Sequence, residues 1–161
     1  MGYFYNPNIY PVQEYKLRLD STRRVAEELN IELVEGLYDT DLWYRAVAGL
    51  ENEPEGGKRC PVCFKMRMQN TYQFMLESGC DMFATTLTMG SNKSGKLMEQ
   101  LGAEIDKERY LARDFKKKDG FKRANELARR WGLYRQNYCG CVFSLRESED
   151  RRKLKNSEAE K

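Results

Sequence analysis

The stretch Tyr3–Tyr15, YFYNPNIYPVQEY, sets the order of the first elements of the fold. Its aromatic, β-prone beginning predicts the end of a strand, which Pro7 terminates. Pro11 suits the first turn of a helix, where its missing N–H costs nothing. The apolar spacing predicts a helix over residues 11–30 and a short strand at 31–36. The inward positions expected on this helix are Val12, Tyr15, Leu19, Val25, Ala26 and Leu29.

Helices and strands continue to alternate along the chain. Further helices are expected at residues 39–50, 64–78, 93–108 and 120–132, and strands at 81–88 and 109–115. Asp39 or Asp41 suits the N-cap of the second helix, and Gly79 suits a left-handed cap after the third. This alternation predicts an α/β fold, a parallel sheet with helices on both faces that binds ligands beyond the carboxyl ends of its strands.

The organisation of the chain predicts one domain. We find no internal repeat and no linker, so residues 1–145 are expected to form a single α/β domain. Residues 146–161, RESEDRRKLKNSEAEK, are nearly all charged, and this tail is expected to be a frayed helix or disordered.

The composition is that of a soluble globular protein, with 33% charged and 12% aromatic residues among 161. A net charge of +3 is too small to identify a nucleic-acid partner by itself. No apolar run approaches the roughly 20 residues that span a bilayer, and MGYFYNPN lacks signal-peptide and myristoylation patterns. We therefore expect a cytoplasmic protein without a membrane partner, where paired cysteines indicate metal or redox chemistry.

The chain has no histidine, and this limits its chemistry. A Ser-His-Asp triad, a Cys-His nucleophile and a two-Cys two-His zinc finger are excluded within the chain. Any metal would have to be held by thiolates, with or without a carboxylate.

Four of the five cysteines form two close pairs. Cys60 and Cys63, in KRCPVCFKMR, have C-x-x-C spacing in a loop that enters a helix, where two sulfurs can face one metal. Cys139 and Cys141 flank a glycine that lets both sulfurs point to one side. Structural cysteines are the alternative for the first pair. Cys80 stands apart and is expected to be an apolar core or edge residue.

If a parallel sheet brings the two pairs together, four thiolates complete a tetrahedral or cuboidal metal site. We expect them to converge near the carboxyl ends of the strands. Pairs more than about 15 Å apart would exclude a shared site, because metal–sulfur bonds are only about 2.3 Å long.

Basic residues cluster around these pairs and in DFKKKDGFKR. They predict either a solvated helix face or a surface that tracks phosphates. The residues are Lys58, Arg59, Lys65, Arg67, Lys116, Lys117, Lys118, Lys122, Arg123, Arg129, Arg130 and Arg135. Tyr134 and Tyr138 are candidates to stack on an unpaired base, with core packing of one of them as the alternative. TMGSNKSGK, residues 88–96, is similar to an anion-binding turn but does not match the P-loop.

Taken together, five segments resemble the QueH-type epoxyqueuosine reductases, in order from Tyr3 to Ser144: YFYNPNIYPVQEY, EGGKRCPVCFKMR, TTLT, RDFKKKDGFKR and GLYRQNYCGCVFS. The resemblance implies a Rossmann-like fold whose iron–sulfur chemistry reduces the epoxide of epoxyqueuosine, at the tRNA wobble position, to queuosine. It implies that Cys60 and Cys63 bind a 4Fe-4S cluster. Cys139 and Cys141 would serve as a redox-active dithiol or ligate an additional iron.

The same resemblance implies two partners, a tRNA that carries epoxyqueuosine and an electron donor. The residues expected to contact the tRNA are Arg67, Lys117, Lys118, Arg123, Arg135 and Tyr138. We expect weak, salt-sensitive tRNA binding, since each phosphate contact releases counterions.

The sequence departs from the family pattern in two places. The family opens with a central strand that carries an adjacent Cys-Cys pair and a nearby acid, and the chain is expected to lack this strand. MGSNKSGK also differs from the family's usual Ser-Pro-His/Tyr-Lys type of segment, so the resemblance does not establish Lys93 as a substrate contact. We therefore expect the 161 residues alone to reduce epoxyqueuosine below the normal rate, because two cysteines supply only two ligands of a four-iron cluster.

Two other classes of function remain open. A non-catalytic RNA-binding module with a structural four-cysteine zinc site is distinguished by colour, because an iron–sulfur protein is brown and a zinc protein is colourless. A relative of the ATP-dependent tRNA thiolases ranks last, because the Ser-Gly-Gly-type pyrophosphate loop is absent from the sequence.

Overall fold

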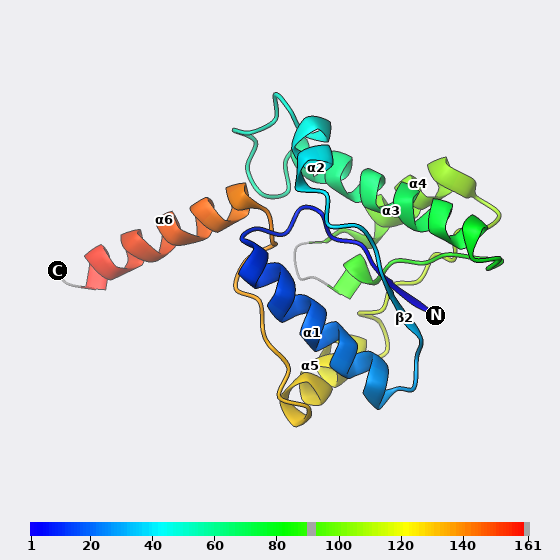
Figure 1. Cartoon of the computed structure of the whole chain (residues 1–161). Coiled ribbons are helices and arrows are strands. Elements are labelled where there is room, and N and C mark those ends of the chain that lie inside the picture. The colour runs from blue at the N-terminus through cyan, green and yellow to red at the C-terminus, as the bar shows by residue number, and fades with distance from the viewer. Residues whose placement is uncertain (90–92, 160–161) are drawn as a thin grey trace. The chain divides into compact units, whose positions relative to one another are not determined.

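A computed structural model describes residues 1–89 and 93–159 of the chain (Figure 1). The chain forms two compact units. The first unit comprises Met1–Arg59 and Tyr134–Lys161, and the second comprises Cys60–Leu133. The expectation of one domain over residues 1–145 stays a prediction.

A two-stranded parallel sheet and one connecting helix begin the first unit. Strand β1 (Gly2–Phe4) pairs with strand β2 (Leu33–Glu35), and helix α1 (Val12–Glu28) connects them. This is the strand, helix and strand order that the sequence predicts, with the parallel direction that a helical crossover produces.

The core of the first unit lies between α1 and β1. Tyr15 and Leu19 of α1 pack with Phe4 and Ile9, and all four side chains are buried. The ring centroids of Tyr15 and Phe4 are 5.4 Å apart, in the edge-on geometry that aromatic pairs favour.

The inward face predicted for α1 is correct in its middle and wrong at its ends. Tyr15, Leu19 and Ala26 are buried and Val25 is half-buried. Val12 and Leu29, by contrast, are 41% and 51% exposed. Val12 is the first residue of the helix and Leu29 follows the last, so neither has a full helical turn beyond it to cover it.

Helices α2 (Thr40–Ala46) and α6 (Val142–Ala159) complete the first unit. Asp39 caps α2 as predicted, because its carboxylate accepts the backbone N–H of Leu42 at 3.0 Å. The charged tail is helical as far as Ala159, and its helix begins before the predicted boundary at residue 146. Figure 1 shows α6 extending away from the rest of the first unit.

The second unit is helical around an apolar core. Its elements are α3 (Arg59–Glu77), the 3-10 turn η1 (Thr86–Met89), α4 (Gly95–Asp106) and α5 (Gly120–Arg130), with Arg59 itself counted in the first unit. The buried core consists of Cys60, Phe64, Met68, Met75, Phe83, Met98, Leu101 and Tyr110. Gly79 has a φ of +68° just after α3, which confirms the predicted left-handed cap.

The strands predicted at residues 81–88 and 109–115 shrink to one parallel bridge between Phe83 and Tyr110. The parallel direction is as predicted. A continuous Rossmann-like sheet is not formed by the described residues, which are mostly helical with a small parallel sheet.

The Thr85 hydroxyl accounts for the shortened strand after Phe83. It accepts the backbone N–H of Leu87, two residues on, at 3.2 Å. Side chains that bond the backbone locally compete with a strand ladder, and here the segment turns into η1 instead.

Within the described ranges, no helix has the length and apolar content needed to cross a bilayer.

Candidate cysteine sites

Cys60 and Cys63 are the second and fifth residues of α3, and both are buried. The helix begins at Arg59, earlier than the predicted start at residue 64, because Pro61 is tolerated in a first turn. Residues three apart share one face of a helix, so the two sulfurs project from the same side. The pair stands at the helix end whose dipole favours negative charge.

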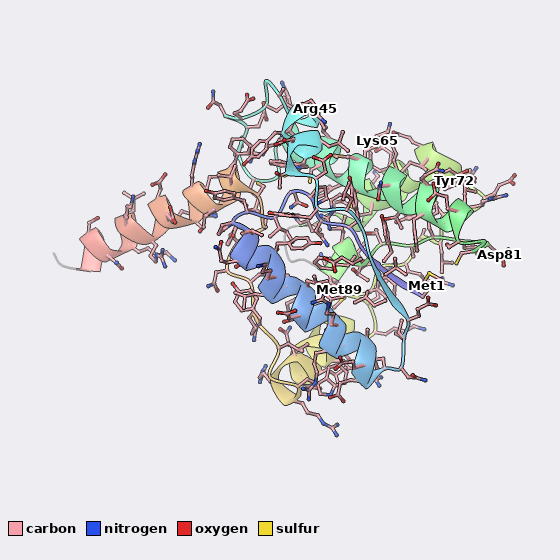
Figure 2. The ribbon with its side chains drawn as sticks, viewed as in Figure 1. Met1, Arg45, Lys65, Tyr72, Asp81 and Met89 are labelled. Atoms are coloured by element: carbon pink, nitrogen blue, oxygen red, sulfur yellow. The ribbon has the colours of Figure 1, made fainter. Side chains whose placement is uncertain are left out.

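Polar contacts tie the helix of this first pair to α4. Figure 2 labels Lys65 and Tyr72 on α3. The Lys65 ammonium lies 2.9 Å from the Glu104 carboxylate and lowers its pKa, and the Tyr72 hydroxyl donates to Asp106 at 3.1 Å. The backbone N–H of Arg109 is the main reason that the pKa of Asp106 is lowered. Together with the core beneath it, these contacts fix α3 within the second unit.

Cys139 and Cys141 flank Gly140 in the segment that leads into α6. Gly140 has a φ of +133°, a conformation that side chains other than glycine rarely adopt. A Cβ at this position would lie 2.9 Å from Nη1 of Arg18 and 3.3 Å from Nδ2 of Asn8. Both the backbone angle and the close neighbours therefore require a glycine between the two cysteines.

Cys141 caps helix α6. Its Sγ accepts the backbone N–H of Ser144 at 3.4 Å, and its carbonyl accepts that of Leu145 at 3.0 Å. The buried Ser144 hydroxyl donates to the same carbonyl at 2.9 Å and lies 3.4 Å from Sγ. A sulfur at an N-cap faces the positive end of the helix dipole, which suits a thiolate or a metal-bound sulfur.

Arg18 of α1 holds the backbone on the other side of Gly140. Its Nη1 donates to the carbonyl of Cys139 at 2.9 Å and its Nη2 to that of Tyr138 at 3.1 Å. Its Nε pairs with the Glu14 carboxylate at 2.8 Å, and its guanidinium lies 5.3 Å from the Tyr138 ring centroid. Arg18 and Glu14 are not among the residues predicted from the sequence, although their spacing of four on a predicted helix is a recognisable signal.

Two tyrosines extend this network. The Tyr134 hydroxyl donates to Glu14 at 2.6 Å, and this hydrogen bond raises the pKa of Tyr134. The Tyr138 hydroxyl donates to the carbonyl of Tyr10, and burial raises the pKa of Tyr138 to about 12. The N–H of Tyr10 in turn donates to the carbonyl of Gly140 at 2.8 Å. Tyr138 is thus engaged within the first unit, whereas Tyr134 keeps 36% of its surface exposed.

Arg59 was predicted to belong to the phosphate-tracking surface, and this prediction is wrong. Arg59 is only 1% exposed, because its Nη1 donates to the carbonyls of Leu50 and Glu51, each at 3.1 Å. Its guanidinium stacks 4.5 Å from the ring centroid of Phe143, and its Nη2 lies 3.6 Å from Glu147. Arg59 therefore holds the loop before Cys60 against α6 within the first unit.

The other predicted tRNA contacts differ in exposure. In the second unit Lys117, Lys118 and Arg123 are exposed and Arg67 is half-buried, while Arg135 is exposed in the first unit. For the predicted turn at 88–96, residues 90–92 lie outside the described residues. Lys93 next to them places its ammonium 4.8 Å from the Phe64 ring centroid.

Each cysteine pair offers two thiols to a metal. Among the residues that the structure describes, no three or more Cys, Asp or Glu side chains are grouped to hold an ion. Two buried sulfurs on one helix face and two flanking a glycine fit soft, thiolate-bound metals such as iron in a cluster. Cys80 packs against the core of the second unit, as predicted for an apolar residue. Convergence of the two pairs stays a prediction.

Comparison with known proteins places this arrangement in a family. The model of the epoxyqueuosine reductase QueH family matches residues 1–147. Relatives of that name from Streptococcus pyogenes serotype M1, Acinetobacter baylyi and Thermotoga maritima are 39%, 37% and 34% identical over 89%, 91% and 92% of this chain. The chain spans 60%, 69% and 81% of their respective lengths. The chain therefore belongs to the QueH epoxyqueuosine reductase family.

Proposed function

We propose that this chain acts in the cytoplasm as an epoxyqueuosine reductase, reducing the epoxide of epoxyqueuosine in tRNA to give queuosine. Its family and the names of its relatives support the substrate and the reaction. The observation that carries the proposal is the pair Cys139 and Cys141, which is built into the N-terminus of α6 and braced by α1. Bracing of this kind is typical of cysteines that react or bind metal rather than fill space.

The number of electrons that the epoxide reduction needs matches the number that a dithiol supplies. Removal of the epoxide oxygen as water consumes two electrons and two protons. Closure of Cys139 and Cys141 into a disulfide breaks two S–H bonds, forms one S–S bond and releases two electrons and two protons. An external thiol or another electron donor would then return the pair to the dithiol state.

Cys60 and Cys63 would supply two ligands of a 4Fe-4S cluster, and Cys139 and Cys141 would either cycle as the dithiol or ligate an additional iron. A cluster supplies one-electron chemistry that a thiol pair alone lacks. The first pair suits the ligand role because it stands on a fixed helical turn and is buried, which excludes water from the sulfurs.

The expected tRNA contacts are Lys117, Lys118 and Arg123, together with Arg67, Arg135 and Tyr138. The first three are exposed, and Lys118 has a φ of +53°. Such a left-handed turn costs about 1–3 kcal/mol for a residue other than glycine and is common where loops contact ligands. Replacing these three residues by Gln should flatten the salt dependence of tRNA binding, since each lost phosphate contact lowers the slope. An unchanged slope would assign them to a solvated face.

The decisive experiment reconstitutes the chain with iron and sulfide in the absence of air and adds tRNA that carries epoxyqueuosine. We expect a brown protein that forms queuosine in proportion to the disulfide between Cys139 and Cys141. Cys139→Ser and Cys141→Ser should each abolish this product, and Cys80→Ser should not. A colourless zinc protein that binds the tRNA without reducing it would favour the RNA-binding alternative. Full turnover by either serine variant would exclude the dithiol.

A further inference from the structure

We propose that Arg18 is a positioning residue for the second cysteine pair, setting the distance between Cys139 and Cys141 by clamping the backbone just before Gly140. This inference rests on the proposed function, because it assigns a task to a pair whose chemistry is itself proposed. It concerns contacts within the first unit only.

This clamp consists of hydrogen bonds from all three nitrogens of the Arg18 guanidinium. Nη1 and Nη2 donate to the carbonyls of Cys139 and Tyr138 at 2.9 and 3.1 Å, while Nε is held by Glu14 at 2.8 Å. The side chains of Arg18 and Glu14 are only 11% and 8% exposed. Bonds from a charged donor in such surroundings are stronger than those of a neutral or exposed group.

The second cysteine of the pair is held by a different element. Cys141 is fixed by the first turn of α6 through its sulfur and its carbonyl. Cys139 precedes the flexible Gly140, so the order of its backbone depends on contacts from α1. The two sulfurs therefore keep a constant separation only if both supports are intact.

The identity of the residue matters as well as its charge. The planar fork of arginine reaches two carbonyls and a carboxylate at once, which the single ammonium of lysine does not reproduce. Gly140 completes the fit, because a Cβ there would lie 2.9 Å from the Arg18 Nη1. The geometry thus predicts that Arg18→Lys keeps the charge opposite Glu14 but loses the clamp.

The test compares Arg18→Lys and Arg18→Met with Arg24→Lys, using the full chain. Arg24 is the matched control, because it lies on the same helix and pairs with Glu28 at 3.0 Å but is 55% exposed. Two readouts are needed. One is amide hydrogen exchange at residues 139–141, and the other is the equilibrium of the Cys139–Cys141 disulfide with glutathione.

Both Arg18 variants should raise exchange at residues 139–141 and lower the effective concentration of the dithiol, each by at least about tenfold, since two charge-assisted hydrogen bonds are lost. Exchange in β1 and β2 should stay unchanged in Arg18→Lys, which separates positioning from loss of folding. Arg24→Lys should match the unaltered chain. Equal exchange and equal disulfide equilibrium in Arg18→Lys and the unaltered chain would overturn the proposal.

The outcome also separates this inference from the proposed function. If the unaltered chain forms no disulfide between these cysteines, the dithiol part of the proposed function fails. Exchange at residues 139–141 then decides the clamp alone: a local rise in both Arg18 variants supports it, and no rise overturns it.

Discussion

The two cysteine pairs of this chain are held in position by different kinds of structure. Cys60 and Cys63 take their spacing from a single helical turn in α3, and the packed core of the second unit fixes that helix. Cys139 and Cys141 lie outside regular structure at the entry to α6 and depend on Arg18 and Tyr10, which are distant in sequence. A helical turn sets a spacing by local rules, whereas a braced loop needs tertiary contacts.

The two cysteine pairs should therefore be sensitive to substitutions in different parts of the chain. Changes in the core of the second unit should disturb the first pair and leave the second pair unaffected. Changes in α1 should do the reverse. The largest effect of all should come from removing a sulfur itself.

Cys63→Ser should strongly weaken iron binding by the first pair. A structural zinc ion in a zinc-finger peptide contributes roughly 10–16 kcal/mol in total, so by analogy losing one thiolate should weaken iron binding by at least about a hundredfold. The measurement is iron and sulfide per chain after anaerobic reconstitution. Cys80→Ser is the control, because Cys80 packs against the core as an apolar residue, and it should load normally. Equal loss in both variants would indicate that the core, and not a ligand pair, was disturbed.

Met98→Ala should destabilise the second unit by about 2–5 kcal/mol, because Met98 is fully buried and its truncation leaves a cavity. Amide exchange in α3 should rise, while exchange at residues 139–141 should not. Met82→Ala in the same unit should have little effect, because Met82 is 48% exposed. A rise at both cysteine pairs would show that the two units unfold together and that the pairs are not independently supported.

These differences also explain what the sequence could predict. The capping roles of Asp39 and Gly79 follow from local rules and are confirmed. The helix predicted after the first pair is also formed, but it begins at Arg59 and includes both cysteines, which were predicted in the loop before it. The strand predicted after Phe83 is wrong, because the Thr85 hydroxyl bonds the backbone locally and the segment turns into η1.

The support of the second pair depends on pairings between distant segments. Arg18 and Cys139 are 121 residues apart, and no local pattern links them. The burial of Arg59 has the same origin, because a basic residue beside a cysteine predicts a surface until its carbonyl partners are known.

Gly140→Ala should lower the free energy of unfolding more than Gly49→Ala. The difference measures how rigidly Arg18 is held beside Gly140. Both glycines have positive φ, +133° and +81°, so both variants bear backbone strain of about 1–3 kcal/mol. A Cβ at Gly49 would meet no atom within 4 Å, whereas at Gly140 it would crowd Arg18. We expect a further loss of about 1–3 kcal/mol at Gly140 from this overpacking. Urea unfolding of the two variants gives their free energies of unfolding. Equal losses would mean that the Arg18 side chain moves away from the added Cβ without cost.

The smallest expected effect tests the contact between Ser144 and the sulfur of Cys141. Ser144→Ala removes a buried hydroxyl that donates to the Cys141 carbonyl at 2.9 Å and lies 3.4 Å from Sγ, at a cost of about 1 kcal/mol. Ser148→Ala is matched, because the Ser148 hydroxyl makes the same backbone contact, to Leu145 at 3.0 Å, one turn later.

The rate at which iodoacetamide alkylates Cys141 is the informative measurement. In Ser144→Ala the cap of α6 loses a support and space opens beside Sγ, so the rate should rise a few-fold. In Ser148→Ala it should not change, because that hydroxyl has no sulfur beside it and lies beyond the first turn. Equal rates in both variants would show that Ser144 supports only the helix backbone. The second pair would then depend on the N–H of Ser144 and on the hydrogen bonds from Arg18 of α1.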